Sequence, residues 1–461
     1  MSHPDSSSVQ SSELSRFDRR EKLALMILAL AQAMLVIDIT AVNVALPLMS
    51  RDLGLDASLA SWTVAAYTVP FGGLLLFGGR LADVFGVRRM LLFGLVVFTI
   101  ASLASAIAVE PILFLSARAV QGIGAALVSP AALSTLVRRF DGVRRHRALA
   151  VWGGTGGAGA AVGVLIGGLL AGGSGWRWIF LMNVPIGAVI AVALPIAVLA
   201  TMPDKRQPLG AGSAIFATVG FASLIAAISL LGRVAVPILA LLVAIALALL
   251  VGFVVLERRA TQPLIRLALL RSRPLISGAS LLLVSTGVLI GTFFLLSFRL
   301  QVGENWTPIG TGLAFLPIAV GVAAGAQLGG HLLGRFGARR VAPIAMLLAA
   351  AGLGAPALGS SDITTIVAAS VAAIGLGASF VCASTTGLSE VEPSESGAAS
   401  GLLNSFHELG SGIGVATIGA IAVAGFGIGF AALAAAAVVG GAVAIGLPPG
   451  KPAAGTVHFG H

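Results

Sequence analysis

Uninterrupted apolar runs of about 20 residues recur along the whole chain, and they constrain its fold more than any other feature. A helix of this length is about 30 Å long, which matches the hydrocarbon thickness of a bilayer. Fourteen such runs can be counted, and few charged residues interrupt them. The sequence therefore predicts an all-α membrane protein with fourteen transmembrane helices.

The composition excludes a soluble domain. Hydrophobic residues make up 57% of the chain and charged residues only 10%, whereas soluble domains carry about 25% charged residues. The 60 glycines suit helices that associate in lipid through small side chains. The net charge of +10 is spread over short clusters between the apolar runs, so we expect the lipid bilayer, and no nucleic acid, as the partner.

The fourteen runs divide into two groups of six and a pair between them. We expect the inserted pair to leave two six-helix bundles that occupy equivalent places in the fold. The expected domains are a disordered tail at 1–22, an N-terminal bundle at 23–200, the inserted pair at 213–256, a C-terminal bundle at 274–446, and a second tail at 447–461.

The basic residues predict how the chain is oriented. Nearly all of the 28 Lys and Arg residues fall in the two tails and in alternate loops, which places these segments in the cytoplasm by the positive-inside rule. We therefore expect a multi-pass protein of the plasma or inner membrane with both termini cytoplasmic. The opposite loops hold only Arg51, Arg177, Arg233 and Arg299.

A short segment after the second run is repeated after the tenth. Residues 79–89 read GRLADVFGVRR and residues 330–340 read GHLLGRFGARR. Matching segments in two six-helix halves are typical of secondary transporters built from parallel repeats related by a pseudo-two-fold axis. In the second copy Gly334 replaces Asp83.

Four segments in this order resemble those of a known family, the major facilitator superfamily, and specifically its fourteen-span drug:proton antiporter branch (EmrB/QacA type). The resemblance covers nearly the whole span region and implies a carrier that is driven by the proton gradient without a cofactor. The four segments are Asp38–Pro47, Gly79–Arg89, Arg118–Gly124 and Trp176–Gly187.

Asp38 and Arg118 are the predicted proton-coupling residues. Ionisable groups inside a span cost about 2.5–3.5 kcal/mol on insertion scales, so their presence needs a reason. A desolvated carboxyl group at Asp38 can bind and release a proton, and Arg118 can pair with a carboxylate and exchange partners. The resemblance links both motifs to coupling. The alternatives are a protonated Asp38 bonded to a neighbouring helix and a static ion pair at Arg118.

Glu408 lies on a stripe of small and polar residues at three- and four-residue steps, which faces a cavity or another helix and not lipid. An acid there could attract a cationic substrate. The alternative is a helix-packing stripe on which Glu408 reaches water. The expected substrate-binding residues are Glu408, Asn404, Gln121 and Tyr67.

The repeated segment and the fifth span supply the expected gating residues. Gly79 permits tight packing at the end of the second span, and Asp83 can cap the next helix or pair with a basic residue. The resemblance implies that this loop stabilises one access state. Packing or topology alone could explain the glycines and arginines, and Val164 stands where the branch has proline. The gating set is Gly79, Asp83, Gly86, Arg88, Arg89, Gly163 and Gly167.

The function expected from these features is proton-coupled multidrug efflux by alternating access, with lipophilic and often cationic substrates. The alternatives are a proton-coupled symporter for a small nutrient and an exporter of an endogenous metabolite. The sequence shows no metal-ligand cluster and no nucleophile with a base, so we expect no enzyme activity, no catalytic residues and no metal. A monomer is the expected state.

Overall fold

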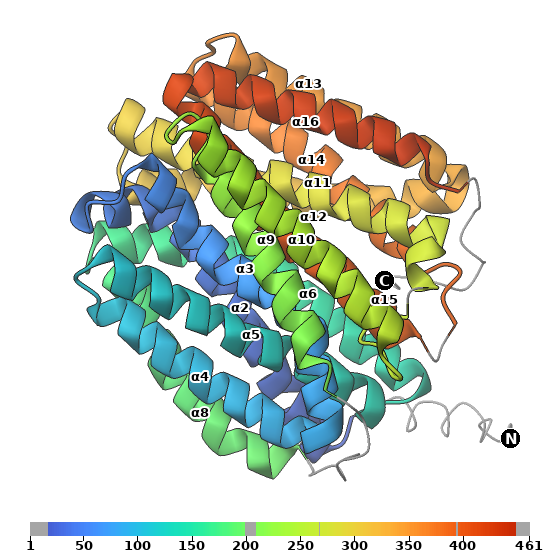
Figure 1. Ribbon diagram of the computed structural model, residues 1–461. Coiled ribbons are helices and arrows are strands. Elements are labelled where there is room, and N and C mark those ends of the chain that lie inside the picture. Colours follow the sequence, from blue (N-terminus) through green and yellow to red (C-terminus); the bar gives the residue numbers. More distant parts are fainter. Residues whose placement is uncertain (1–16, 199–208, 267, 393–394, 449–461) are drawn as a thin grey trace, which may run out of the picture.

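The computed structural model describes residues 17–198, 209–266, 268–392 and 395–448. Every regular element in these ranges is helical, and 14 candidate spans are long and apolar enough to cross a bilayer. The prediction of an all-α membrane protein with fourteen spans is confirmed. The long helices lie alongside one another in Figure 1.

The first six spans form a bundle that we call the N-half. The sixth span consists of two consecutive helices, α7 and α8, on either side of Met182. The helices of the N-half are α2 (Arg19–Asp52), α3 (Ala57–Phe85), α4 (Val87–Ile107), α5 (Pro111–Arg139), α6 (Gly142–Gly172), α7 (Arg177–Leu181) and α8 (Asn183–Ala197).

The last six spans form the C-half, and the inserted pair lies before them in the chain. The inserted pair is α9 (Ala211–Ser229) and α10 (Val236–Arg259). The main helices of the C-half are α11 (Arg273–Phe298), α12 (Pro308–Phe336), α13 (Ala338–Ala357), α14 (Asp362–Gly387), α15 (Ser396–Ile421) and α16 (Phe426–Ile445). The short helical segments are η1 (Leu269–Arg271), η2 (Arg299–Gly303, a π-helix) and η3 (Ala422–Ala424).

The two halves share one packing pattern. In the N-half, α5 packs against α3 and α4, and α2 packs against α6. In the C-half, α14 packs against α12 and α13, and α11 packs against α15. Because α11 to α16 take up in order the places of α2 to α8, the internal repeat extends from the short matching segments to the whole bundle.

In each half, a glycine with positive φ precedes the third span. Gly86 precedes α4 with a φ of 96°, and Gly337 precedes α13 with a φ of 77°. Residues with a Cβ rarely adopt this conformation. The turn therefore explains why both copies of the repeated segment carry glycine at this place.

The first helix begins earlier than the sequence analysis expected. α2 starts at Arg19, where Asp18 and Glu21 form a reciprocal capping box. Residues 19–22, which we assigned to a disordered tail, are the first turn of this helix. This turn is not part of an apolar run because all four of its residues are charged. The rest of the expected tails, residues 1–16 and 449–461, lies outside the described residues.

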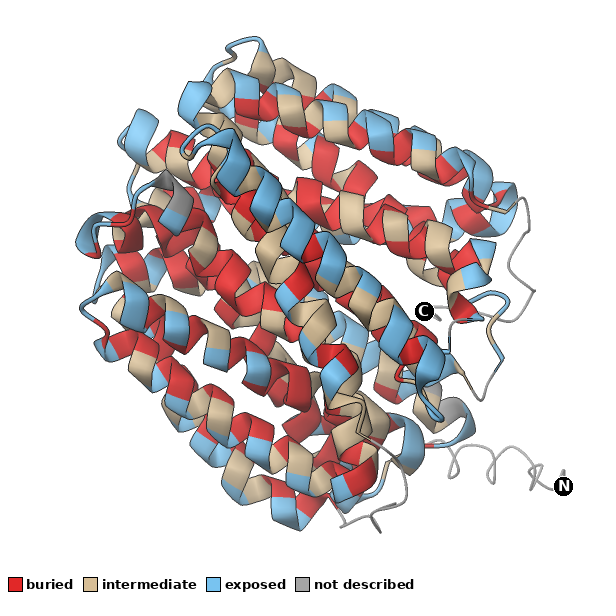
Figure 2. Cartoon of the chain, in the orientation of Figure 1, coloured by how far each residue is buried: buried red, intermediate tan, exposed pale blue. Residues whose placement is uncertain are grey.

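The inserted pair covers the boundary between the halves. α9 packs against both α3 and α15, and α10 packs against α9. Figure 2 shows that α10 is largely exposed along its length. The chain after α10 contacts both halves: Pro263 accepts a hydrogen bond of 2.8 Å from Arg80 of α3, and Arg266 forms an ion pair of 2.8 Å with Glu395, just before α15.

The halves are sealed at one end. We call the side on which α2 begins and α16 ends the terminal side, and the opposite side the far side. At the far side, Gln301 Nε2 donates a hydrogen bond of 2.7 Å to the carbonyl oxygen of Val44 in α2. Nearby, a Cβ on Gly168 of α6 would lie 2.7 Å from the carbonyl oxygen of Pro308 in α12.

α6 and α12 separate toward the terminal side. The face of α6 that touches α12 at Gly168 continues by helical periodicity through Val164 to Gly157 and Gly153. A Cβ on Gly157 or Gly153 would meet no atom within 4 Å, and both glycines are exposed. The two helices therefore diverge, and the space between the halves opens on the terminal side next to α6.

Candidate functional site

Asp38 lies at the centre of a buried polar network. Its Oδ2 accepts a hydrogen bond of 2.6 Å from Arg118 Nη1, and its Oδ1 accepts bonds of 2.9 Å from Gln121 Nε2 and 2.9 Å from Asn183 Nδ2. Asp38 and Arg118 are each only 1% exposed. The two predicted proton-coupling residues, 80 positions apart in the sequence, are thus one ion pair.

Arg118 has further partners besides Asp38. Its Nε donates to the carbonyl oxygen of Thr63 at 3.2 Å, and its Nη1 also donates to Gln121 Oε1 at 2.8 Å. The ring of Tyr67 lies 4.5 Å from the guanidinium carbon, a distance at which the ring face attracts a cation. A planar guanidinium satisfies all these groups at once, which an ammonium could not.

Asn183 and Ser102 belong to the network although we predicted no role for them. Asn183 Nδ2 donates to both Asp38 Oδ1 and Ser102 Oγ, the latter at 3.0 Å, and Ser102 donates to the carbonyl oxygen of Phe180. Asn183 stands in one of the four segments that carry the family resemblance. An amide within an apolar span was the available signal for its role.

Gln121 and Tyr67, which we predicted to bind substrate, lie in this network. Gln121 is 0% exposed and both polar ends of its amide are bonded, to Asp38 and to Arg118. Tyr67 is also 0% exposed. In this structure both side chains support the ion pair and neither faces an open cavity.

Gly122 lets α3 approach the network. A Cβ at this position would collide with the carbonyl oxygen of Tyr67. We expect Gly122→Ala to destabilise the protein by about 1–3 kcal/mol, because the backbones of α3 and α5 must separate. Gly154→Ala is the matched control, since nothing lies within 4 Å of its Cβ. Thermal unfolding in detergent should show a lower Tm for the first variant only, and equal Tm values would contradict this packing.

Glu408 lies at the boundary between the halves, where α15 packs along α3. It is 8% exposed, and a Cβ on Gly72 of α3 would lie 2.9 Å from the Cβ of Glu408. The same stripe of α15 touches α3 at two further places, where Gly401 meets Leu76 and Gly412 meets Thr68. The predicted polar stripe therefore faces a partner helix, and that helix is α3.

The neighbours of Glu408 on α15 have different surroundings. Asn404, one turn nearer the terminal side, is exposed. His407 forms a hydrogen bond of 2.8 Å through Nδ1 with the hydroxyl of Thr286 on α11, and its ring lies 5.5 Å from that of Phe380. His407 thus joins α15 to α11 within the C-half.

The predicted gating loop contains one ion pair between helices. Asp83 does not cap α4; its Oδ1 accepts a bond of 2.6 Å from Arg138 Nη2 at the end of α5. Both side chains are partly exposed, at 40% and 54%. Arg88 is half-buried and Arg89 is exposed. The tight helix contact expected at Gly79 is instead made one residue earlier.

Gly78 makes this contact: a Cβ there would collide with the carbonyl oxygen of Ala126 in α5. At Gly79 a Cβ would meet only the Cβ of Pro130, at the ordinary distance of 3.8 Å. Helical periodicity explains the difference, because a shift of one residue turns a side chain by about 100°. Gly79 therefore does not provide the close packing that we predicted.

Gly163 and Gly167 hold α6 against α2. A Cβ on Gly163 would collide with the hydroxyl of Thr40, and one on Gly167 would lie 2.7 Å from Cα of Ala41. Thr40 and Ala41 lie next to Asp38 in the sequence. The glycine stripe of the fifth span therefore packs against the segment of α2 that carries Asp38, and its predicted gating role stays a prediction.

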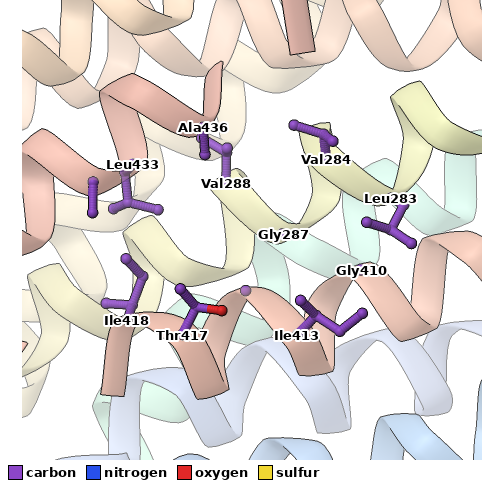
Figure 3. Close-up of a pocket in the computed structure, with 12 residues that line it drawn as sticks. Leu283, Val284, Gly287, Val288, Gly410, Ile413, Thr417, Ile418, Leu433 and Ala436 are labelled. Carbon is purple, nitrogen blue, oxygen red and sulfur yellow. The ribbon is translucent and has the colours of Figure 1, made fainter. Parts of the chain in front are cut away.

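An apolar cavity of about 150 Å³ lies between α11, α15 and α16 (Figure 3). Gly287, Gly410 and Gly414 form part of its wall, and the hydroxyl of Thr417 is a polar group at its edge. None of the predicted site residues lines this cavity. The candidate site is therefore the buried network of the N-half together with the α3–α15 boundary.

Comparison with known proteins assigns the chain to a family. Residues 28–325 match the family described as Major Facilitator Superfamily. The chain belongs to the Major Facilitator Superfamily. This membership confirms the resemblance noted in the sequence, and it makes the chain a multi-pass membrane transporter.

Two relatives have names that refer to antibiotics. The puromycin resistance protein of Streptomyces alboniger is 35% identical over 424 residues, covering 88% of this chain and 82% of the relative. The lincomycin resistance protein of Streptomyces lincolnensis is 33% identical over 412 residues, covering 86% and 84%. The chain is thus similar to members of its superfamily whose names refer to antibiotic resistance.

A solved structure confirms the fold. The POT family transporter PepTSo matches with a TM-score of 0.69 at 16% identity, covering 93% of this chain and 97% of that structure. At this identity the match speaks for the fold alone.

Proposed function

We propose that the protein exports lipophilic, often cationic, compounds in exchange for protons. The observation that carries this proposal is the buried ion pair of Asp38 and Arg118, because an acid that is 1% exposed in an apolar bundle is costly unless it has a role. The antibiotic-resistance names of the relatives support an export direction. The proton gradient supplies the energy, no cofactor takes part, and the substrate is not chemically changed.

Proton binding at Asp38 competes with the donors that surround it. The carboxylate accepts three hydrogen bonds in this structure, and a proton on the Oδ2 atom would convert its charge-assisted bond with Arg118 into a weaker contact. Arg118 would then be free to shift toward its other acceptors, Gln121 and the carbonyl of Thr63. Through this exchange a proton could alter the packing of α5 against α2 and α3.

The transport cycle that we propose is alternating access. The seal at the far side and the divergence of α6 and α12 at the terminal side correspond to a state open on the terminal side. Given the distribution of basic residues, this side is cytoplasmic. The compound would enter from the cytoplasm or the inner leaflet and leave when the halves rock to open the far side.

Asp83→Asn is expected to slow transport while leaving the fold intact. The pair with Arg138 is partly exposed, so its loss should change the free energy of unfolding by no more than about 1 kcal/mol. It joins the ends of α3 and α5, however, and its loss should shift the balance of access states. Reactivity of single cysteines on the two sides should change in the variant. Unchanged reactivity with unchanged turnover would contradict this role.

The experiment that tests the proposed function uses inverted membrane vesicles. With a pH gradient established by respiration, addition of a transported compound should partly collapse the gradient in vesicles that contain this protein. A panel of neutral, monocationic and dicationic compounds identifies the substrate class. If no compound from the panel moves protons while uptake of a sugar or organic acid does, the nutrient symporter is the correct function instead.

A further inference from the structure

The two membrane acids differ in which half of the molecule surrounds them. Every partner of Asp38 belongs to the N-half: Arg118 and Gln121 come from α5 and Asn183 from α8. Glu408 belongs to the C-half but packs against Gly72 of the N-half. When the halves rock as rigid bodies, the surroundings of Asp38 can therefore stay intact, whereas those of Glu408 must change.

Glu408 has no partner for a negative charge. Among the described residues its carboxyl group forms no hydrogen bond or ion pair, although it is 8% exposed. The hydroxyls of Tyr67, Thr68 and Ser405 at the same boundary are also buried without a partner in the described part of the chain. An uncompensated charge in such a place is strongly unfavourable. A bound proton or cation would remove this cost.

The ionisable groups around Glu408 can be named helix by helix. On α3 the ionisable residue nearest in sequence to the contact at Gly72 is Tyr67, whose ring lies against Arg118. On its own helix His407 is occupied with Thr286 of α11. The described segments of α9 and α16 carry no ionisable residue. Of the other helices against α15, α11 begins with Arg273, and α14 contributes Asp362 at the far side and the buried Cys382.

We infer that Glu408 is a second proton-binding site, which responds to the relative position of the two halves. While α15 packs against α3, as here, the side chain of Glu408 is largely buried and its carboxyl group holds a proton. When the halves move and water reaches it, the O–H bond breaks and the proton passes to water, since water stabilises the carboxylate. Because the backbone of α3 lies directly against Glu408 at Gly72, this contact must change when the halves move. This inference rests on the proposed proton-coupled function.

The test measures conformation in the absence of substrate. It therefore separates proton binding at Glu408 from a role of this residue in substrate recognition. The full-length chain, with Cys382→Ala to remove its single cysteine, carries Gly154→Cys on α6 and Gly330→Cys on α12, where a Cβ meets nothing within 4 Å. Spin labels at these two positions report the opening between α6 and α12 in lipid nanodiscs. The distance distribution is recorded from acid to alkaline pH without substrate.

We expect the wild-type background to move between two distance populations as the pH changes, and Glu408→Gln to show the protonated population at every pH. Glu408→Asp, which keeps a titratable group, should restore the response. Glu110→Gln, the same change at an exposed acid just before α5, is the matched control and should behave as the background. Asp38→Asn should reduce the pH response of the distance distribution less than Glu408→Gln does.

Two results would overturn the inference alone: a pH response in Glu408→Gln that equals that of the background, or a background that shows no pH response at all. If the wild-type protein moves no protons with any compound in vesicles, the proposed function fails and this inference fails with it. The vesicle assay on the wild-type chain therefore distinguishes the two failures.

Discussion

Asp38→Asn is expected to reduce proton-driven export of every substrate to the level of membranes without the protein. The amide has nearly the same shape as the carboxylate but cannot bind and release a proton. It can still accept a hydrogen bond from Arg118, which also keeps its bonds to Gln121 and to the carbonyl of Thr63. Arg118 loses its counter-charge, so the Tm should fall, but the hydrogen bonds that remain should keep the variant folded in the membrane.

The measurement is gradient-driven efflux of a neutral, a monocationic and a dicationic compound at matched protein amounts. Binding of each compound, measured without a gradient, is the control, and it should be retained because Asp38 is 1% exposed and bonded on all sides within its own bundle. Selective loss for cations only would show that Asp38 contacts the compound. Retained coupling would contradict its role as the proton site.

Arg118→Lys is expected to reduce the rate of export strongly while it leaves the fold nearly unchanged. The guanidinium contacts Asp38, Gln121 and the carbonyl of Thr63 through two of its nitrogens. An ammonium carries the same charge on a single nitrogen and cannot reach all three groups in this geometry. We expect export to fall more than tenfold while the Tm falls only slightly.

Arg118→Ala removes the positive charge altogether, whereas Arg118→Lys changes only the shape of the charged group. Removal of one member of a buried pair leaves Asp38 uncompensated and should cost about 3–5 kcal/mol of folding free energy. The double variant Arg118→Ala with Asp38→Asn should recover much of this stability but none of the transport. Thermal unfolding of the three variants in detergent gives the comparison. Wild-type turnover in Arg118→Lys would show that a positive charge alone is sufficient.

The fold was largely predictable from the sequence because lipid imposes one simple requirement. A span needs about 20 apolar residues, and this pattern is local. Boundaries set by other forces were missed. The first turn of α2 depends on the capping box of Asp18 and Glu21, and the sixth span is interrupted at Met182, just before Asn183 and Pro185.

The members of the candidate site were predictable, but their arrangement was not. Asp38 and Arg118 stood out because ionisable residues are rare in spans. Nothing local indicates that they pair with each other, or that Gln121 and Tyr67 contact this pair. These contacts depend on how separate helices pack, and periodicity gives only the face of each helix. Glu408 contacts α3 across the boundary between the two halves, and no local sequence pattern indicates this contact.

The most direct test of proton-coupled export uses the purified protein alone in liposomes. A pH jump imposes a gradient without any other pump, and uptake of a substrate identified in the vesicle assay is followed over time. We predict accumulation of the compound on the acidic side that a protonophore abolishes and that Asp38→Asn lacks. Movement of the compound at the same rate with and without the gradient would contradict proton coupling.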